Sequence, residues 1–320
     1  MTHATPTAQP GLIASIAILG RDIKLAHSVF ALPFAVLAAV LAMPEGAPRE
    51  RWIGTLELVI ACMVLARTWA MLFNRIADRR FDAENPRTRR RALALGSVPL
   101  RRAIVLAALA AVAFVACTSV FGLVYHNWWP LILSVPVLAW IAFYSLTKRF
   151  TGLCHLVLGT ALAASPLAAA IGVGGLAALN PAAPEGHAAW AILALAGMVV
   201  FWVAGFDVIY ALADLEFDRQ AGLHSIPARL GWRGAAWASR AMHALALAFL
   251  VLVPALEPRL GLPFMLGVVA VAGLLVLEHA ILARSGPAGL DVAFFTVNGV
   301  VSVLLGTIGV LDTLLWVNGS

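Results

Sequence analysis

The sequence predicts an all-α fold, a polytopic membrane bundle of about nine transmembrane helices with two related Asp-rich motifs. The first observation is composition: the 320 residues are 62% hydrophobic and only 12% charged, whereas soluble domains carry about 25% charged residues. The second is the recurrence of apolar runs of roughly 20 residues, the length at which a helix crosses a bilayer. The third is an acidic six-residue pattern that occurs twice, each time at the end of an apolar run.

Nine apolar runs are expected to span the membrane, and segments rich in proline, glycine or asparagine separate several of them. The expected spans are residues 25–43, 52–74, 103–124, 129–146, 152–174, 188–210, 236–253, 262–284 and 291–317. Gly299, Gly306 and Gly309 in the last span allow a bend or close helix packing. One integral-membrane domain is expected over residues 1–320, with a flexible N-terminal segment at 1–20.

Lysine and arginine gather in alternate loops, and this asymmetry predicts orientation because cytoplasmic loops are the more basic ones. The basic loops follow the second, fourth and sixth spans, and Arg21 and Lys24 precede the first span. The other side carries only Arg49, Arg51 and Arg259. The N-terminus and both acidic motifs are therefore predicted to face the cytoplasm from the inner (cytoplasmic) membrane. The net charge of +6 reflects this topology and does not indicate a nucleic-acid partner.

The acidic pattern is Ala-Asp-x-x-Phe-Asp, at residues 77–82 and again at 213–218. Carboxylates four residues apart lie on one face of a helix, about one turn from each other. Asp and Asn oxygens are hard ligands that suit Mg²⁺, which completes its shell with water and substrate phosphate. The two copies therefore predict a divalent-metal site. A pair of ordinary solvated acidic loops is the alternative.

Polar residues extend each motif into the apolar run that precedes it. Arg67 lies seven residues before Asn74, and Asp207 lies seven before Asp214, so each falls on the helix face of its motif. An ionisable residue inside an apolar run is costly and indicates function by default. A structural ion pair between helices is the alternative for both residues.

A third polar cluster, Tyr144-x-x-x-Lys148-Arg149, ends the fourth span. Tyr144 and Lys148 share a helix face because they are four residues apart. A lysine that extends to the membrane surface beside an interfacial aromatic residue explains the pair without any function. Beside two metal-type motifs on the same membrane side, phosphate binding by Lys148 is the functional interpretation.

Together these groups predict oxygen ligands and basic side chains above a deep apolar cavity. The matching ligand has a diphosphate head and a long hydrocarbon tail. Metal ions that bridge a diphosphate make it a better leaving group, because they neutralise the charge that develops on it. If the departing carbon is allylic, an electron-rich ring can attack the resulting cation, which aromatic side chains stabilise with their negative faces.

This combination resembles the UbiA-type intramembrane aromatic prenyltransferases over nearly the whole chain. The resemblance rests on Asn74-x-x-x-Asp78-x-x-x-Asp82, Asp207-x-x-Tyr210-Ala-x-x-Asp214-x-x-x-Asp218, Tyr144-x-x-x-Lys148-Arg149, Arg67 and Arg87-Thr88. It implies nine transmembrane helices, Mg²⁺, and transfer of a polyprenyl group from polyprenyl diphosphate to an aromatic acid within the lipid bilayer.

The resemblance also implies a role for each candidate residue. The magnesium and diphosphate ligands would be Asn74, Asp78, Asp82, Asp214 and Asp218. The substrate-binding candidates are Lys148, Arg149, Tyr210 and Asn74. The catalytic candidates, which would position the substrates or the cation, are Arg67, Tyr144 and Asp207.

Within the family the chain resembles the 4-hydroxybenzoate polyprenyltransferases of quinone biosynthesis, which act in the ubiquinone pathway. The segment His27–Pro33 is more similar to a related branch assigned to menaquinone made through futalosine. In that branch the acceptor would be a dihydroxynaphthoate. Both acceptors therefore stay open at the level of sequence.

Other classes of protein fit less well. A membrane CDP-alcohol phosphotransferase also spaces aspartates four apart for magnesium, but its single motif needs an Asp-Gly followed by Ala-Arg, which this chain lacks. A transporter carries paired repeats and intramembrane charges, yet its site lies near the bilayer midplane between broken spans. Here the acidic groups gather at the cytoplasmic edge, which favours an enzyme. Prenylation of haem or chlorophyll fits the motif detail less closely.

Overall fold

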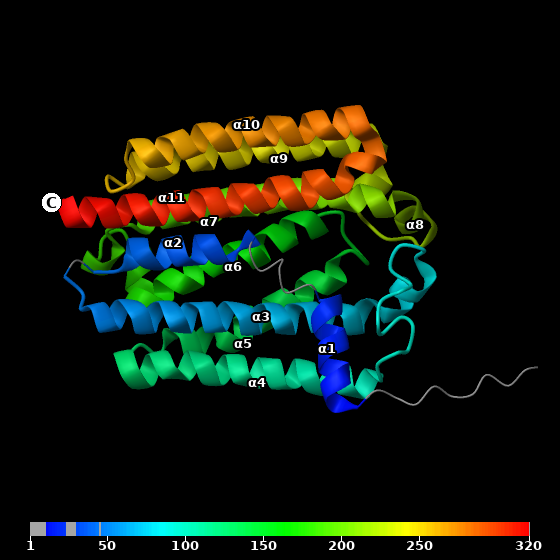
Figure 1. Cartoon of the computed structure of the whole chain (residues 1–320), viewed down its shortest axis with the longest axis horizontal. Coiled ribbons are helices and arrows are strands. Elements are labelled where there is room, and N and C mark those ends of the chain that lie inside the picture. The colour runs from blue at the N-terminus through cyan, green and yellow to red at the C-terminus, as the bar shows by residue number, and fades with distance from the viewer. Residues whose placement is uncertain (1–10, 24–29, 45, 320) are drawn as a thin grey trace, which may run out of the picture.

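The computed structural model describes residues 11–23, 30–44 and 46–319, and every regular element within these ranges is a helix (Figure 1). The bundle helices are α2 (Leu32–Ala42), α3 (Arg49–Glu84), α4 (Leu100–Tyr125), α5 (Trp129–Thr147), α6 (Cys154–Gly174), α7 (Ala189–Ala211), α9 (Ile226–Leu256), α10 (Leu262–Ser285) and α11 (Asn298–Gly319). Among the described residues, eight helical segments are long and apolar enough to cross a membrane, and α2 is apolar but shorter. The predicted all-α membrane fold is confirmed. It follows from the need to satisfy every backbone N–H and C=O inside the hydrocarbon layer.

The remaining helical elements are short. They are α1 (Leu12–Asp22), α8 (Leu215–Gln220), the 3₁₀ segments η2 (Gly175–Leu179), η3 (Pro184–Gly186), η4 (Leu212–Asp214) and η5 (Gly286–Gly289), and the π-helical segment η6 (Val292–Val297). In Figure 1, α1 lies across α3 and α4 near one end of the bundle, where α8 and residues 85–99 also lie. Both Asp-rich motifs are therefore at the same end of the molecule.

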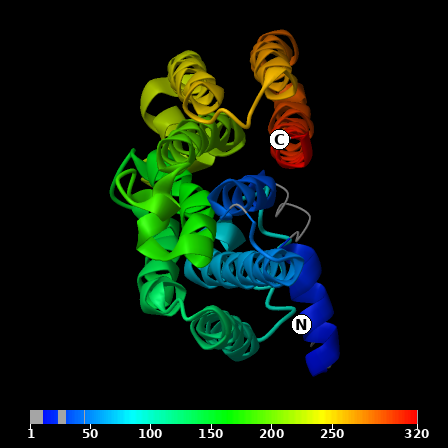
Figure 2. The same cartoon turned by 90° about the vertical axis from the view of Figure 1, so that its left-hand side faces the viewer.

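From α4 to α11, each long helix of the bundle packs against the next one along the chain. Viewed end-on, α4, α5, α6, α7, α9, α10 and α11 follow one another along an arc, and α2 lies on its inner side (Figure 2). Because α2 contacts both α6 and α11, it connects the two sides of the arc. The helix α3 packs against α4 and α5, so the first motif and the second reach the same end from different parts of the bundle.

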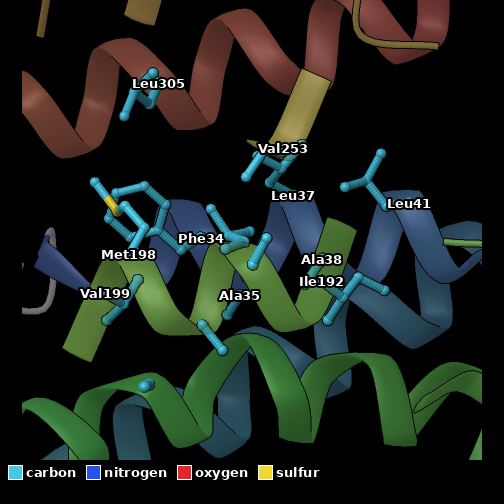
Figure 3. Packing of buried hydrophobic residues seen from close by; sticks show 14 of the residues in the cluster. Phe34, Ala35, Leu37, Ala38, Leu41, Ile192, Met198, Val199, Val253 and Leu305 are labelled. Atoms are coloured by element: carbon cyan, nitrogen blue, oxygen red, sulfur yellow. The ribbon is translucent and has the colours of Figure 1, made fainter. Parts of the chain in front are cut away.

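The centre of the core is α2, which lies between α7 and α11 in Figure 3. Its Phe34, Leu37 and Leu41 are completely buried. Gly306 of α11 allows the close approach to α2, because a Cβ atom at this position would overlap Pro33. The close packing that the sequence suggested for the last span is thus observed for Gly306.

The N-terminal segment is helical where the structure describes it. A flexible segment was predicted at residues 1–20; of these, residues 12–20 belong to α1, whose Leu19 is buried against α3 and α4. Residues 1–10 lie outside the described ranges, as do Lys24, which precedes the first predicted span, and residues 25–29 of that span. The described helix of that span, α2, has 11 residues, or roughly 17 Å, which is shorter than the hydrocarbon layer.

The two motifs differ in local structure. The first lies within α3, which continues ten residues beyond its predicted end at residue 74. The second does not continue a regular α-helix. Instead, α7 ends at Ala211, η4 carries Asp214, and α8 carries Asp218. Tightening to a 3₁₀ turn is common at helix ends, and here it separates Asp218 from the helical face that Asp207 shares.

The seventh span begins ten residues earlier than predicted. Ser225 caps α9 by accepting a hydrogen bond from the Ala228 N–H at 3.2 Å, and Pro227 occupies the first turn. Gly231 has a positive φ of 69° inside this helix and forms a kink. The turns of α9 before residue 236 precede the apolar run on which the span was predicted.

Candidate active site

A cavity of about 960 Å³ opens between the helices and is lined by both motifs. Along α3 its wall changes from Val59 to Arg67 and then to Asp78. Along α5 it changes in the same direction, from Leu133 to Tyr144. One end of the cavity is therefore polar, and the other is mainly apolar. This is the distribution that an amphiphile with a charged head and a hydrocarbon tail requires.

The first motif presents two oxygen-bearing side chains to the cavity. The Asn74 amide donates a hydrogen bond to Asp78 Oδ2 at 3.0 Å, as their four-residue spacing on α3 allows. Arg149 donates to Asp78 Oδ1 at 3.0 Å and to the carbonyl oxygen of Ala77 at 2.9 Å. Arg75 donates to Asn74 Oδ1 at 3.1 Å and so orients this amide. The predicted positions Asn74 and Asp78 thus lie together on the cavity wall.

The second motif is held by the segment that follows α3. The buried carboxylate of Asp214 accepts hydrogen bonds from Asn85 Nδ2 at 2.8 Å and from Arg87 Nε at 2.8 Å, and it pairs with the Arg87 terminal nitrogen. Arg87 also donates to the Tyr210 hydroxyl at 2.7 Å and lies 4.8 Å above its ring. Residues from the two motif regions, about 130 positions apart, are therefore joined directly.

Asp82 and Asp218 lie behind the cavity wall rather than on it. Asp82 pairs with Arg91 at 2.7 Å, and Asp218 pairs with Lys148 at 2.7 Å and accepts a hydrogen bond from Ser225. Arg91 and Lys148 line the cavity, whereas their two buried partners do not. Each step of four residues turns a helical side chain by about 40°, which carries Asp82 away from the face of Asn74. The structure thus gives both aspartates a contact with a basic residue instead of a place beside the other predicted ligands.

The polar end of the cavity, lined by Asn74, Asp78 and Asp214, is called the mouth below. The basic residues at the mouth keep their charge. Burial disfavours the charged form of Lys148, but attraction by Asp218 and Asp214 outweighs it and raises the pKa of the amine above its usual value. Burial likewise opposes the charge on Arg87, yet its hydrogen bonds to Asp214 raise the guanidinium pKa. Both side chains are therefore cationic throughout the physiological pH range.

The donor set fits magnesium bound jointly with phosphate. Within the described ranges, no three His, Cys, Asp or Glu side chains are arranged to hold a metal by themselves. Asn74 and Asp78 come from one side of the mouth and Asp214 from another, with Lys148 and Arg87 beside them. Few carboxylate ligands, completed by substrate phosphate, are typical of Mg²⁺ rather than of a closed protein cage.

The three predicted catalytic residues line the same cavity, farther from the mouth. Arg67, Tyr144 and Asp207 come from α3, α5 and α7. Arg67 Nε is buried and has no hydrogen-bond partner among the described residues. An unpaired buried donor is costly unless a ligand satisfies it. Asp207 is instead hydrogen-bonded to His155, whose Nδ1 lies 2.7 Å from Asp207 Oδ2.

Aromatic rings cover the wall between these groups and the mouth. Tyr210 stacks on Phe294 with ring centroids 4.2 Å apart, and Phe206 meets Phe294 edge to face at 5.3 Å. All three rings line the cavity. Such rings lie where they can stabilise a cation formed near the mouth. The predicted substrate-binding residue Tyr210 therefore lies on the cavity wall. Arg149 does not line the cavity and pairs with Asp78, which does.

Several site residues were not identified from sequence. His155 carried a usable signal, because it is a polar residue within a predicted apolar span. Asn85 carried none, since it lies in a loop rich in polar residues. The run Arg89–Arg91 was interpreted mainly as a topology signal and a contact to lipid phosphate, so the pairing of Arg91 with Asp82 was not predicted. Asn85 and Arg91 meet their partners because residues 85–99 fold against both motifs.

The chain is similar to known proteins over most of its length. The sequence pattern of the UbiA prenyltransferase family matches residues 31–300. A 4-hydroxybenzoate octaprenyltransferase of Methylococcus capsulatus is 31% identical over 260 residues, 80% of each chain. One of Methylobacillus flagellatus is 36% identical over 232 residues, 72% of this chain and 71% of that protein.

Solved structures show the same architecture. The apo structure of a UbiA homolog from Aeropyrum pernix K1 has a TM-score of 0.77 at 32% identity and covers 90% of this chain and 98% of its own. A UbiA homolog from Archaeoglobus fulgidus bound to DMAPP and Mg²⁺ shares the fold, with a TM-score of 0.62 at 17% identity over 93% of this chain and 98% of its own.

The helical bundle and its cavity, polar at one end and mainly apolar at the other, define a polytopic membrane protein with an internal binding cavity. The chain belongs to the UbiA prenyltransferase family. The resemblance found in the sequence is thereby confirmed.

Proposed function

We propose that the protein transfers a polyprenyl group from polyprenyl diphosphate to an aromatic acid, with 4-hydroxybenzoate as the acceptor. The observation that carries the proposal is the convergence of Asn74, Asp78 and Asp214 with two basic side chains, Lys148 and Arg87, at the mouth of one apolar cavity. The curated relatives are named for transfer to 4-hydroxybenzoate. Such a reaction supplies a step of ubiquinone biosynthesis.

The mouth would bind the diphosphate of the donor. Mg²⁺ held by Asn74, Asp78 and Asp214 would neutralise charge on the departing diphosphate. Lys148 and Arg87 bind the phosphate oxygens by charge-assisted hydrogen bonds. Asp82 holds Arg91, and Asp218 holds Lys148, against the cavity wall. Arg91 and Lys148 are therefore in place before the substrate binds.

The chemistry follows from what lies next to the mouth. The C–O bond to the diphosphate breaks and leaves an allylic cation, which Tyr210, Phe206 and Phe294 stabilise with their ring faces. Arg67 binds the carboxylate of the acceptor, and Asp207 accepts a hydrogen bond from its phenol, which raises electron density on the ring. A ring carbon forms the new C–C bond. The displaced ring proton is released together with the diphosphate.

A parallel assay tests the donor and acceptor together. Membranes that contain the protein are supplied with a polyprenyl diphosphate and Mg²⁺, and with 4-hydroxybenzoate or a dihydroxynaphthoate. We expect a prenylated benzoate by mass spectrometry, and we expect EDTA to abolish it. Membranes without the protein are the control. Exclusive prenylation of the naphthoate would assign the acceptor suggested by His27–Pro33, and no product with either acid would refute the proposed function.

The orientation proposed for this site is cytoplasmic, in agreement with the distribution of arginine and lysine. It predicts the labelling of single cysteines in a background without Cys62, Cys117 and Cys154. Glu84, the last residue of α3, and Glu185, in η3 between α6 and α7, are both exposed. The C-terminal end of α3 and the connection between α6 and α7 lie at opposite ends of the bundle (Figure 1). A membrane-impermeant maleimide applied to intact cells should label Glu185→Cys and not Glu84→Cys, with inverted vesicles giving the converse. Reversed labelling would contradict the orientation and leave the cavity geometry unchanged.

A further inference from the structure

His155 connects the carboxylate of Asp207 to the start of α9. It lies in the first turn of α6, is 2% exposed, and lines the cavity. Its Nδ1 is 2.7 Å from Asp207 Oδ2 on α7. Its other nitrogen, Nε2, accepts a hydrogen bond from the Ile226 N–H at 3.2 Å. One imidazole ring therefore joins three helices at the cavity wall.

These contacts determine the proton position on the ring. A backbone N–H can only donate, so Nε2 must be the unprotonated nitrogen of a neutral imidazole. The ring proton is then on Nδ1 and is donated to Asp207. Among the described residues none forms a hydrogen bond with the other carboxylate oxygen, Oδ1, and the side chain of Asp207 keeps 19% of its surface exposed. One oxygen is thus held by His155 while the other is available to a ligand in the cavity.

The segment at the start of α9 also holds a basic residue of the mouth. The His224 N–H donates to the carbonyl oxygen of Lys148 at 2.7 Å. Ser225 donates to Asp218, which pairs with the Lys148 amine. Ile226, the next residue, is the donor to His155. Residues 224–226 therefore connect Lys148, proposed to bind the diphosphate, with His155, which contacts Asp207 on the proposed acceptor side.

We propose that His155 is a positioning residue for the aromatic acceptor: it orients Asp207 so that Oδ1 faces the acceptor's phenol. The proposal rests on the proposed function, in which Asp207 accepts a hydrogen bond from that phenol. Through its hydrogen bond with Ile226, the same imidazole fixes the position of Asp207 relative to the segment that holds Lys148. The acceptor and the diphosphate are thereby held in a constant relative position, which bond formation between them requires.

Two amide substitutions of His155 separate positioning from packing. The side-chain nitrogen of asparagine lies near the place of Nδ1, so His155→Asn retains a donor to Asp207. The amide group of glutamine reaches the place of Nε2, so His155→Gln meets the Ile226 N–H and leaves Asp207 without its donor. Loss of the hydrogen-bond partner behind a metal ligand costs about 10- to 100-fold, and we expect a loss of this order behind Asp207.

The experiment compares both variants with the wild-type protein in lipid nanodiscs. For His155→Gln we expect kcat/KM for 4-hydroxybenzoate to fall about 10- to 100-fold, with binding of an unreactive prenyl thiodiphosphate plus Mg²⁺ changed less than about twofold. His155→Asn should recover most of the loss. Equal losses in the two variants, or a collapse of donor binding in His155→Gln, would overturn the proposal.

Equilibrium binding of the acceptor separates this inference from the proposed function. Titration calorimetry with 4-hydroxybenzoate requires no turnover, and its affinity should be weaker in His155→Gln than in His155→Asn. If the wild-type protein is inactive but the acceptor still binds more weakly to His155→Gln than to His155→Asn, the proposed reaction is refuted and the positioning role is retained. An active wild-type protein with equal acceptor affinity in both variants would refute the positioning role alone.

Discussion

Replacing Asp214 with asparagine is expected to abolish prenyl transfer, with a loss of at least about 100-fold. Removal of a single group that stabilises developing charge costs about 100- to 1,000-fold, and Asp214 has two such effects. It is a proposed magnesium ligand, and it accepts the hydrogen bonds that place Arg87 at the mouth. Asparagine is close in size but lacks the charge that both partners require. The measurement is the rate of product formation at saturating Mg²⁺ and substrates.

A neighbouring carboxylate provides the matched control. Glu216 lies two residues away in α8, its side chain is 77% exposed, and it does not line the cavity. Glu216→Gln removes the same charge from the same segment and should change the rate less than about twofold, in line with the small effect of exposed ion pairs. Equal membrane insertion of both variants is checked by quantitative blotting. If Asp214→Asn retained more than a tenth of the activity, its assignment as a ligand would be wrong.

Replacing Arg67 with lysine is expected to damage use of the aromatic acid and to spare the diphosphate. Arg67 Nε is buried without a hydrogen-bond partner among the described residues, and a guanidinium binds a carboxylate by two parallel hydrogen bonds that lysine cannot reproduce. A hydrogen bond to a charged group contributes about 1.5–3 kcal/mol, so kcat/KM for the acceptor should fall about 10- to 150-fold. Steady-state kinetics with each substrate varied in turn measure this.

Arg240→Lys is the control for arginine inside a helix. Arg240 lies in α9, stacks on Trp237 with its guanidinium 4.8 Å from the ring centre, and does not line the cavity. Its conversion should leave both kinetic constants within about twofold, as for most substitutions away from a site. If Arg67→Lys lost affinity for an unreactive prenyl thiodiphosphate while the acceptor KM was unchanged, Arg67 would belong to the diphosphate site.

The membrane fold could be predicted from sequence because the bilayer restricts the choices. Apolar runs in a hydrocarbon layer must form helices, since no water is present to bond a free N–H. The locations of the spans followed from this rule, apart from their ends. The helix α3 extends beyond its apolar run to Glu84, and α9 begins before its own at Ile226. Outside the hydrocarbon layer hydropathy no longer indicates where a helix ends.

Sequence by itself determined which residue types form the site and on which helices they lie. Helical periodicity placed Arg67, Asn74 and Asp78 on one face, and the structure finds all three on the wall of one cavity. This worked because α3 is a regular helix throughout the motif. The same reasoning did not hold for Asp218, since η4 interrupts the periodicity between α7 and α8.

Only the tertiary structure decided which charged side chain meets which. Asp214 bonds to Arg87, which is 127 residues away, and Asp207 bonds to His155, which is 52 away. Periodicity relates residues within a turn or two of one helix and contains no information about contacts between helices. Those contacts depend on how α6, α7 and the segment after α3 pack together. Packing therefore turned Asp82 and Asp218 towards their basic partners and left Arg67 Nε open to a ligand.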